Sequence, residues 1–133
     1  AAAAGFKRSF AWQPVSLEEA TAKICALSDT KAGPGLTMMK RMVDNIAKSP
    51  AEPKFRKVRL TNAKVADGLV HVPGVRQFMG AIGWELVEDE FMQLPAEADA
   101  AAQVAAVDTL TNAFAAAKQA ERVAELEARK KEA

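Results

Sequence analysis

Residues 54–95 constrain the fold of this chain most, because helical apolar spacing runs directly into short strand-like segments there. Pro73, followed by apolar residues at positions 75, 78, 79 and 82, predicts a helix over residues 74–82. Gly83 is suited to end this helix in the left-handed conformation. Residues 84–87 and 91–94 then have the pattern of a small hairpin, which is too short to be stable unless it packs on helices.

Helical patterns precede this stretch. Ser16 and Glu19 form a capping box, which predicts that a first helix begins there. Residues 28–35 are rich in glycine and proline and predict a loop. Residues 36–48 carry an apolar stripe at helical spacing and predict a second helix, which ends before a proline.

Two further helices are expected. Thr61 can cap a short helix over residues 62–69. Residues 96–133 are rich in alanine, which has the highest helix propensity, and they predict a long last helix. Its apolar face ends near Ala117, and the polar remainder is expected to project into solvent.

These patterns predict an α+β fold that is mostly α, namely a helical bundle with a small antiparallel β-element packed on it and a long C-terminal helix. At 133 residues the chain is one domain long and needs no disulfide to support a core. We expect a flexible tail over residues 1–14, a domain over residues 15–117 and a polar extension of the last helix over residues 118–133.

Composition and charge indicate no catalytic chemistry. The net charge of +1 favours neither nucleic acid nor a membrane, and no apolar run approaches the roughly 20 residues that span a bilayer. Cys25, the only cysteine, fits a reducing compartment and is interpreted as a core residue rather than a reactive thiol. His71, the only histidine, has no metal-ligand partner at suitable spacing. We therefore expect no metal, no cofactor, no enzyme activity, and a cytoplasmic or nuclear location.

A basic segment opens the central stretch. Apolar residues are interspersed among its five cations, which are Lys54, Arg56, Lys57, Arg59 and Lys64. One aromatic residue in a nearly neutral chain is weak support for a nucleic-acid site. A solvated basic face and a local patch that meets an acidic peptide are the two alternatives. Asn45, on the flank of the second helix's apolar stripe, is either solvated or directed at a group that needs an amide.

Six short segments follow one another in an order that matches a known domain. They are Asp44-Asn45-Ile46, Lys54-Phe55-Arg56-Lys57-Val58-Arg59-Leu60-Thr61-Asn62, Pro73-Gly74-Val75, Phe78-Met79, Ile82-Gly83-Trp84 and Phe91-Met92-Gln93-Leu94-Pro95. Their order and spacing resemble the PUB domain, also called PUG, which is found in cytosolic peptide N-glycanase, UBX-containing adaptors and a linear-ubiquitin ligase. The likeness covers about residues 36–95.

The resemblance implies a non-catalytic adaptor module in the ubiquitin pathway. Such domains bind the C-terminal tail of the valosin-containing AAA+ ATPase (p97), which ends in a Leu-Tyr type of sequence, or a tyrosine motif within another protein. The groove would lie between the second helix and residues 54–62. The parent protein could be an enzyme such as a peptide N-glycanase, whose catalytic core would lie outside these residues.

Six site residues are carried over from the resemblance: Asn45, Lys54, Phe55, Arg59, Asn62 and Gly83. The resemblance implies that the two asparagines hydrogen-bond the ligand and that the two cations meet its acidic groups. The phenylalanine would form an apolar wall for the Leu-Tyr pair, and the glycine would let the backbone approach closely.

The chain departs from the family pattern at Gly80, where large apolar residues are common. This glycine is therefore expected to change the shape of the groove. Phe55 in place of Tyr, and Trp84 in place of Phe, are milder departures. A helical scaffold domain without a peptide ligand is the alternative interpretation. The polar end of the last helix lacks a sustained coiled-coil seam, so we expect a monomer.

Overall fold

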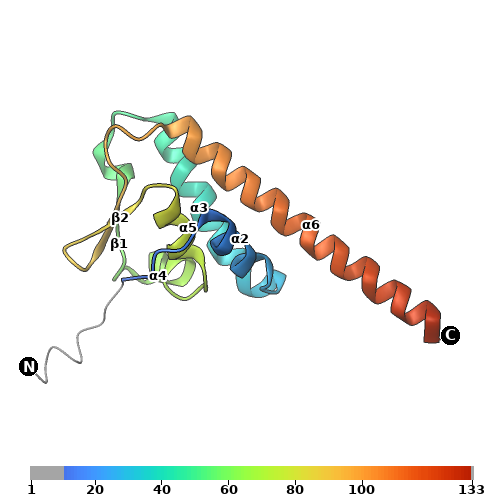
Figure 1. The fold of residues 1–133 in the computed structure, drawn as a ribbon. Helices are drawn as coiled ribbons and strands as arrows, with labels where there is room; N and C mark the ends of the chain where they lie inside the picture. Colours follow the sequence, from blue (N-terminus) through green and yellow to red (C-terminus); the bar gives the residue numbers. More distant parts are fainter. Residues whose placement is uncertain (1–10, 133) are drawn as a thin grey trace, which may run out of the picture.

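The computed structural model describes residues 11–132, in which five α-helices and a 3-10 helix are accompanied by a small sheet at one side of the helical bundle (Figure 1). The elements are α2 (Leu17–Cys25), α3 (Asp29–Lys48), η1 (Pro53–Arg56), β1 (Lys57–Arg59), α4 (Ala63–Leu69), α5 (Val75–Ala81), β2 (Glu85–Val87), β3 (Phe91–Gln93) and α6 (Ala100–Glu132). This architecture confirms the predicted fold class: mostly α, with a small antiparallel sheet and a long C-terminal helix.

Helix α3 begins at Asp29, so the loop that we predicted over residues 28–35 is wrong. The side chain of Ser28 caps the helix by accepting a hydrogen bond from the Lys31 amide at 3.2 Å. Pro34 lies inside the helix, where it removes one backbone hydrogen bond. Packing against the neighbouring helices must therefore outweigh the helix-breaking residues in this turn.

Gly35 provides that packing, because it lets α3 approach α4 and α5 closely. A Cβ atom added at Gly35 would lie 2.8 Å from Val75 Cγ2 and 3.1 Å from the carbonyl oxygen of Gly68. A Cβ atom added at Gly68 would lie 2.6 Å from Met38 Cβ. These separations are shorter than van der Waals contact. The two glycines that weaken the helices locally are thus the residues that allow them to pack.

Helix α6 covers α2 and α3 with one apolar face. Val107, Leu110 and Phe114 of this face are buried, as the apolar spacing predicted. Figure 1 shows that the helix continues past the bundle, and residues 119–131 are all exposed. Lys118 is still buried, and the domain boundary that we placed before it stays a prediction. None of the described helices combines the length and the apolarity needed to cross a membrane.

The basic segment contributes a strand that we did not predict. β1 pairs antiparallel with β3, which also pairs with β2, so the strand order is β1-β3-β2. The pairing of β2 with β3 confirms the predicted hairpin. Val58, Met92 and Leu86 align across the sheet and pack against the core. β1 escaped prediction because its partner β3 lies far along the chain, so no local turn joins the two strands as it joins β2 and β3.

A buried glutamine joins α6 to the connection between α5 and β2. Trp84 Nε1 donates a hydrogen bond to Gln103 Oε1 at 2.9 Å, and Gln103 Nε2 donates to the carbonyl oxygen of Ile82 at 2.7 Å. Gln103 and Trp84 are 4% and 2% exposed, so bulk water cannot readily replace either partner. The two bonds hold the chain on both sides of Gly83, whose φ of 111° is in the positive region that we predicted for it.

Gly33→Ala and Gly35→Ala should change stability in opposite directions. Both residues lie in α3, but nothing lies within 4 Å of a Cβ atom added at Gly33. Gly33→Ala should raise the free energy of unfolding by about 0.5–1 kcal/mol, because alanine has the higher helix propensity. Gly35→Ala should lower it by about 1–3 kcal/mol, because the new methyl group overlaps Val75 and Gly68. Urea denaturation followed by circular dichroism measures both, and equal effects would contradict the close packing of α3.

Gln103→Ala should lower the free energy of unfolding by about 1–3 kcal/mol, because it leaves the Trp84 N–H and the Ile82 carbonyl without partners. Gln119→Ala, on the exposed part of the same helix, is the matched control and should change stability by no more than about 0.5 kcal/mol. Urea denaturation of both variants provides the measurement. Similar values for the two variants would mean that the buried bonds contribute no more than a surface contact.

Candidate functional site

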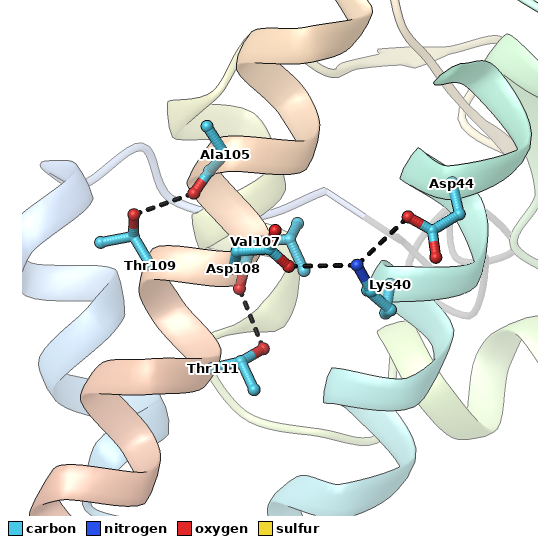
Figure 2. A network of polar contacts seen from close by, with 7 residues as sticks. All are labelled: Lys40, Asp44, Ala105, Val107, Asp108, Thr109 and Thr111. Carbon is cyan, nitrogen blue, oxygen red and sulfur yellow. Dashed lines mark hydrogen bonds and ion pairs between the residues drawn. The ribbon is translucent and has the colours of Figure 1, made fainter. Parts of the chain in front are cut away.

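The C-terminal half of α3 borders the candidate site with a half-buried asparagine. In the Asp44-Asn45-Ile46 motif, Ile46 is fully buried and Asp44 pairs with Lys40 at 3.3 Å. Figure 2 shows Lys40 between Asp44 and Asp108 of α6, to which it donates a hydrogen bond at 3.1 Å. Hydrogen bonds to Asp108 and then to Asp44 raise the pKa of the Lys40 ammonium. The Asn45 side chain has no hydrogen bond within the described part of the chain.

The 3-10 helix η1 positions Lys54 and Phe55 beside α3. Two prolines, Pro50 and Pro53, turn the chain after α3, and η1 packs back against that helix. Phe55 is half-buried against the core, and the Lys54 ammonium lies 5.4 Å from the centroid of its ring. Lys54 is exposed and forms no ion pair with the described residues. An apolar ring with an unpaired cation above it therefore adjoins α3.

Strand β1 continues from η1 and presents Arg59 to solvent. The Arg59 side chain is 60% exposed, and its Nε lies 3.3 Å from Glu90 Oε1. Its guanidinium also lies 5.2 Å from the centroid of the Phe91 ring, above which Lys57 Nζ lies at 4.4 Å. An exposed ion pair contributes at most about 1 kcal/mol. A ligand carboxylate could therefore displace Glu90 from Arg59 at little cost.

Asn62 caps α4, so our prediction that Thr61 does so is wrong. Asn62 Oδ1 accepts hydrogen bonds from the Lys64 and Val65 amides at 3.0 and 3.4 Å. The Thr61 hydroxyl instead donates a hydrogen bond to Glu90 Oε1 at 3.2 Å. The cap uses only the oxygen of the Asn62 amide. Its Nδ2 keeps both N–H groups free of any acceptor among residues 11–132.

Residues 54–62 thus form one continuous segment at the edge of the fold, in which exposed residues are interspersed with buried ones, and we call it the binding edge. It comprises η1, β1 and the turn into α4, and it carries four of the predicted site residues: Lys54, Phe55, Arg59 and Asn62. Both η1 and α4 pack against α3, the helix that carries Asn45. The fold therefore borders the binding edge with the helix that the sequence predicted as its opposite side.

Gly83, the sixth predicted residue, is separated from Arg59 by a strand. Gly83 precedes β2, and β3 lies between β2 and β1. The register aligns Glu85, Gln93 and Lys57, so Gly83 lies at the end of the sheet where η1 joins β1. It is exposed, and a Cβ atom added there would meet only Leu94 Cδ1, at 3.8 Å. Its positive φ rather than crowding requires glycine.

Arg56 differs from the other cations of the basic segment, because it is 7% exposed. Its Nε donates to the Pro50 carbonyl oxygen at 3.2 Å, and its Nη1 donates to those of Pro95 and Ala98 at 2.8 and 3.2 Å. The sequence grouped Arg56 with its exposed neighbours, since nothing in the local pattern distinguishes them. Only the folded chain shows that this arginine is structural.

Trp12, not an open groove, faces Gly80. A Cβ atom added at Gly80 would overlap the indole of Trp12 and lie 3.0 Å from its Cε2. Our expectation that Gly80 reshapes the groove is therefore corrected, since the glycine makes room for this ring. Trp12 belongs to the tail that we predicted over residues 1–14, of which residues 1–10 lie outside the described residues. The carbonyl oxygen of Ala11 accepts a hydrogen bond from Arg76 at 3.2 Å.

Cys25 is half-buried in α2 and packs against the core. Burial raises the pKa of its thiol, and the charge of Lys118 partly offsets this effect. A raised pKa keeps the thiol protonated at neutral pH, which makes it a poor nucleophile. His71 is exposed in the connection between α4 and α5. Across residues 11–132, no group of three or more potential metal ligands lies together.

Comparison with known proteins identifies the family. The PUB domain model matches residues 30–108, more than half of the chain, and this range includes the binding edge, Asn45 and Gly83. Plant UBX domain-containing protein 2 of Arabidopsis thaliana is 33% identical over an alignment of 76 residues, and the match covers 53% of this chain and 17% of that protein. The chain therefore spans only a small part of this relative. PUB domains are protein-interaction domains, and this chain belongs to the PUB domain family.

Proposed function

We propose that this PUB domain is a non-catalytic adaptor that binds the C-terminal tail of the valosin-containing AAA+ ATPase (p97). In this role it links its parent protein to ubiquitin-dependent and ER-associated degradation, in the cytoplasm or the nucleus. The observation that carries the proposal is the binding edge, where the free Asn62 amide, the unpaired Lys54 and the weakly paired Arg59 flank the half-buried ring of Phe55 beside α3. Family membership supports the same role.

The groups on the binding edge suit an acidic peptide that ends in Leu-Tyr. The free Nδ2 of Asn62 and the amide of Asn45 are available to hydrogen-bond the peptide backbone or the tyrosine hydroxyl. Lys54 has no competing carboxylate, and Arg59 has only an exposed one, so both cations are available for acidic side chains. The ring of Phe55 offers an apolar wall.

Affinity should be modest. A tail of a few residues buries only a few hundred Å², well below the roughly 1,600 Å² of a standard interface. We therefore expect a Kd of about micromolar, with the aromatic residue of the tail contributing most of the binding energy. Such an affinity suits an adaptor that exchanges on and off a large assembly.

A second candidate ligand is a tyrosine motif within another ubiquitin-pathway protein. Exposed residues occur at both ends of the binding edge, from Lys54 to Asn62, and they do not by themselves require a chain end. A peptide with residues after the tyrosine distinguishes the two ligands. Binding of this extended peptide at least as tight as that of the free-ended one would favour the internal motif. A helical scaffold without any peptide ligand would bind neither.

Titration of a labelled acidic-Leu-Tyr peptide, followed by fluorescence anisotropy, should give a Kd of about micromolar. Asn45→Ala and Arg59→Ala should each weaken binding about tenfold, because each removes a hydrogen bond or a charge that meets the peptide. Helical circular dichroism should stay unchanged in both variants.

Lys31→Ala is the matched control, since it removes one exposed positive charge from the start of α3 and should leave the Kd unchanged. Absence of binding at about 1 mM peptide would rule out the unfoldase tail as ligand. Loss of helicity in Asn45→Ala or Arg59→Ala would instead mean that those side chains are structural.

Phosphorylation of the peptide tyrosine should weaken binding. The phosphate places a dianion and extra bulk where the site presents an apolar ring and needs a phenol hydroxyl, and we expect this to outweigh the attraction of Lys54 and Arg59. Comparing tyrosine, phosphotyrosine and phenylalanine peptides in the same titration separates loss of the hydroxyl from the effect of the phosphate. Tighter binding of the phosphopeptide would show that the cations dominate.

A further inference from the structure

A cleft of about 220 Å³ lies beside η1 and outside the six predicted site residues. Its walls come from the turn after α3, which contains Pro50 and Ala51, and from the segment after β3, which contains Leu94 and Ala96. Its volume is several times the roughly 30 Å³ that one water molecule occupies. The cleft therefore has room for a small charged group together with part of the chain that carries it.

Arg56 lines this cleft with a guanidinium that is only partly used. Its Nε and Nη1 donate to three carbonyl oxygens, whereas its Nη2 has no acceptor among the described residues. No buried side-chain nitrogen in residues 11–132 is both sealed from solvent and unpaired, so Nη2 must reach solvent. Because Arg56 is only 7% exposed and lines the cleft, we infer that Nη2 opens into it.

The charge of Arg56 is not balanced by an acidic side chain. No Asp or Glu oxygen of the described residues lies within 4.0 Å of its guanidinium nitrogens. Carbonyl oxygens satisfy N–H groups but leave the net charge in place, and buried charges are normally paired. The cleft therefore favours an anion. Gln93 also lines it, and the Gln93 amide has no hydrogen bond within the described chain.

We propose that this cleft is a carboxylate-binding subsite, in which Arg56 Nη2 and the Gln93 amide donate to the two oxygens of a ligand carboxylate. The proposal rests on the proposed function for the source of that carboxylate, which is the peptide held at the binding edge. Pro50, Pro53 and Leu94 supply apolar walls for the short aliphatic stem of an acidic side chain or for a chain end.

The position of the cleft suits this role. Pro53 and Arg56, which line it, belong to the same turn of η1 as Lys54 and Phe55 of the binding edge. A peptide extends about 3.3 Å per residue, so residues close to the one on Phe55 can reach round η1 into the cleft. One 3-10 helix would then hold the aromatic residue of the peptide on one side and a carboxylate on the other.

Two variants test the subsite without removing Arg56, which the fold needs. Ala51→Leu fills the cleft, and Gln93→Met removes the amide donors while keeping the length of the side chain. Each should weaken binding of the acidic-Leu-Tyr peptide about tenfold, as expected for lost hydrogen bonds to a charged group. Ala105→Leu, an exposed position on α6, makes the same size change and should bind as the wild type does.

Binding of two modified peptides identifies which carboxylate of the ligand occupies the cleft. One has an amidated C-terminus, and the other has its acidic side chains replaced by amides. The change that weakens binding to the wild type but not to Ala51→Leu identifies the carboxylate that occupies the cleft. Wild-type affinity in both cleft variants would overturn the proposal. The proposal would also be overturned if both peptide modifications weakened binding to Ala51→Leu as much as they weaken binding to the wild type.

A direct titration separates failure of this subsite from failure of the proposed function. Sodium acetate should shift the Arg56 Nε–H and Gln93 amide NMR signals saturably, and sodium chloride at equal ionic strength should not. If the peptide fails to bind while acetate shifts these signals, the proposed function fails and the carboxylate site stands. Absence of an acetate-specific shift overturns the carboxylate site, whatever the peptide does.

Discussion

The guanidinium of Arg56 joins the segments on which the candidate site depends. Its hydrogen bonds reach the turn that follows α3 and the segment between β3 and α6. The backbone carbonyl of the same residue accepts a hydrogen bond from the Leu94 amide at 2.7 Å. One residue therefore holds η1 against both of these segments. Lys54 and Phe55 lie on the same turn, so their positions follow from these bonds.

The cations of the basic segment divide into two groups with different physical roles. Arg56 is desolvated, and losing its partners would leave buried groups unsatisfied at a cost of about 1–3 kcal/mol each. Lys54 and Arg59 are exposed, and the one ion pair that Arg59 makes is weak enough for a ligand to replace. The fold thus uses two nitrogens of the Arg56 guanidinium for its own structure, and it leaves Lys54 and the weakly paired Arg59 accessible to a partner.

The elements with clear periodicity were predictable from the sequence, and those decided by packing were not. α5 was predicted because four apolar residues define one face of it. The hairpin of β2 and β3 was predicted because two apolar runs flank an acidic turn. The start of α3 was missed because Gly33, Pro34 and Gly35 signal a loop locally. Its helical form depends on contacts with α4 and α5, which lie far from this turn in the sequence.

The sequence by itself determined the family, the mostly helical class and the residue types of the candidate site, because motif order, periodicity and side-chain chemistry are properties of the chain. Only the tertiary structure decided which of these side chains are free. Asn62 uses its oxygen as a helix cap, Arg56 is buried among carbonyl groups, and Trp12 covers Gly80. The role of Asn62 depends on the geometry of the helix cap. The roles of Arg56 and Trp12 depend on burial and on partners that are distant in sequence. Local pattern does not encode those partners, because they are brought together only when the helices and the sheet pack.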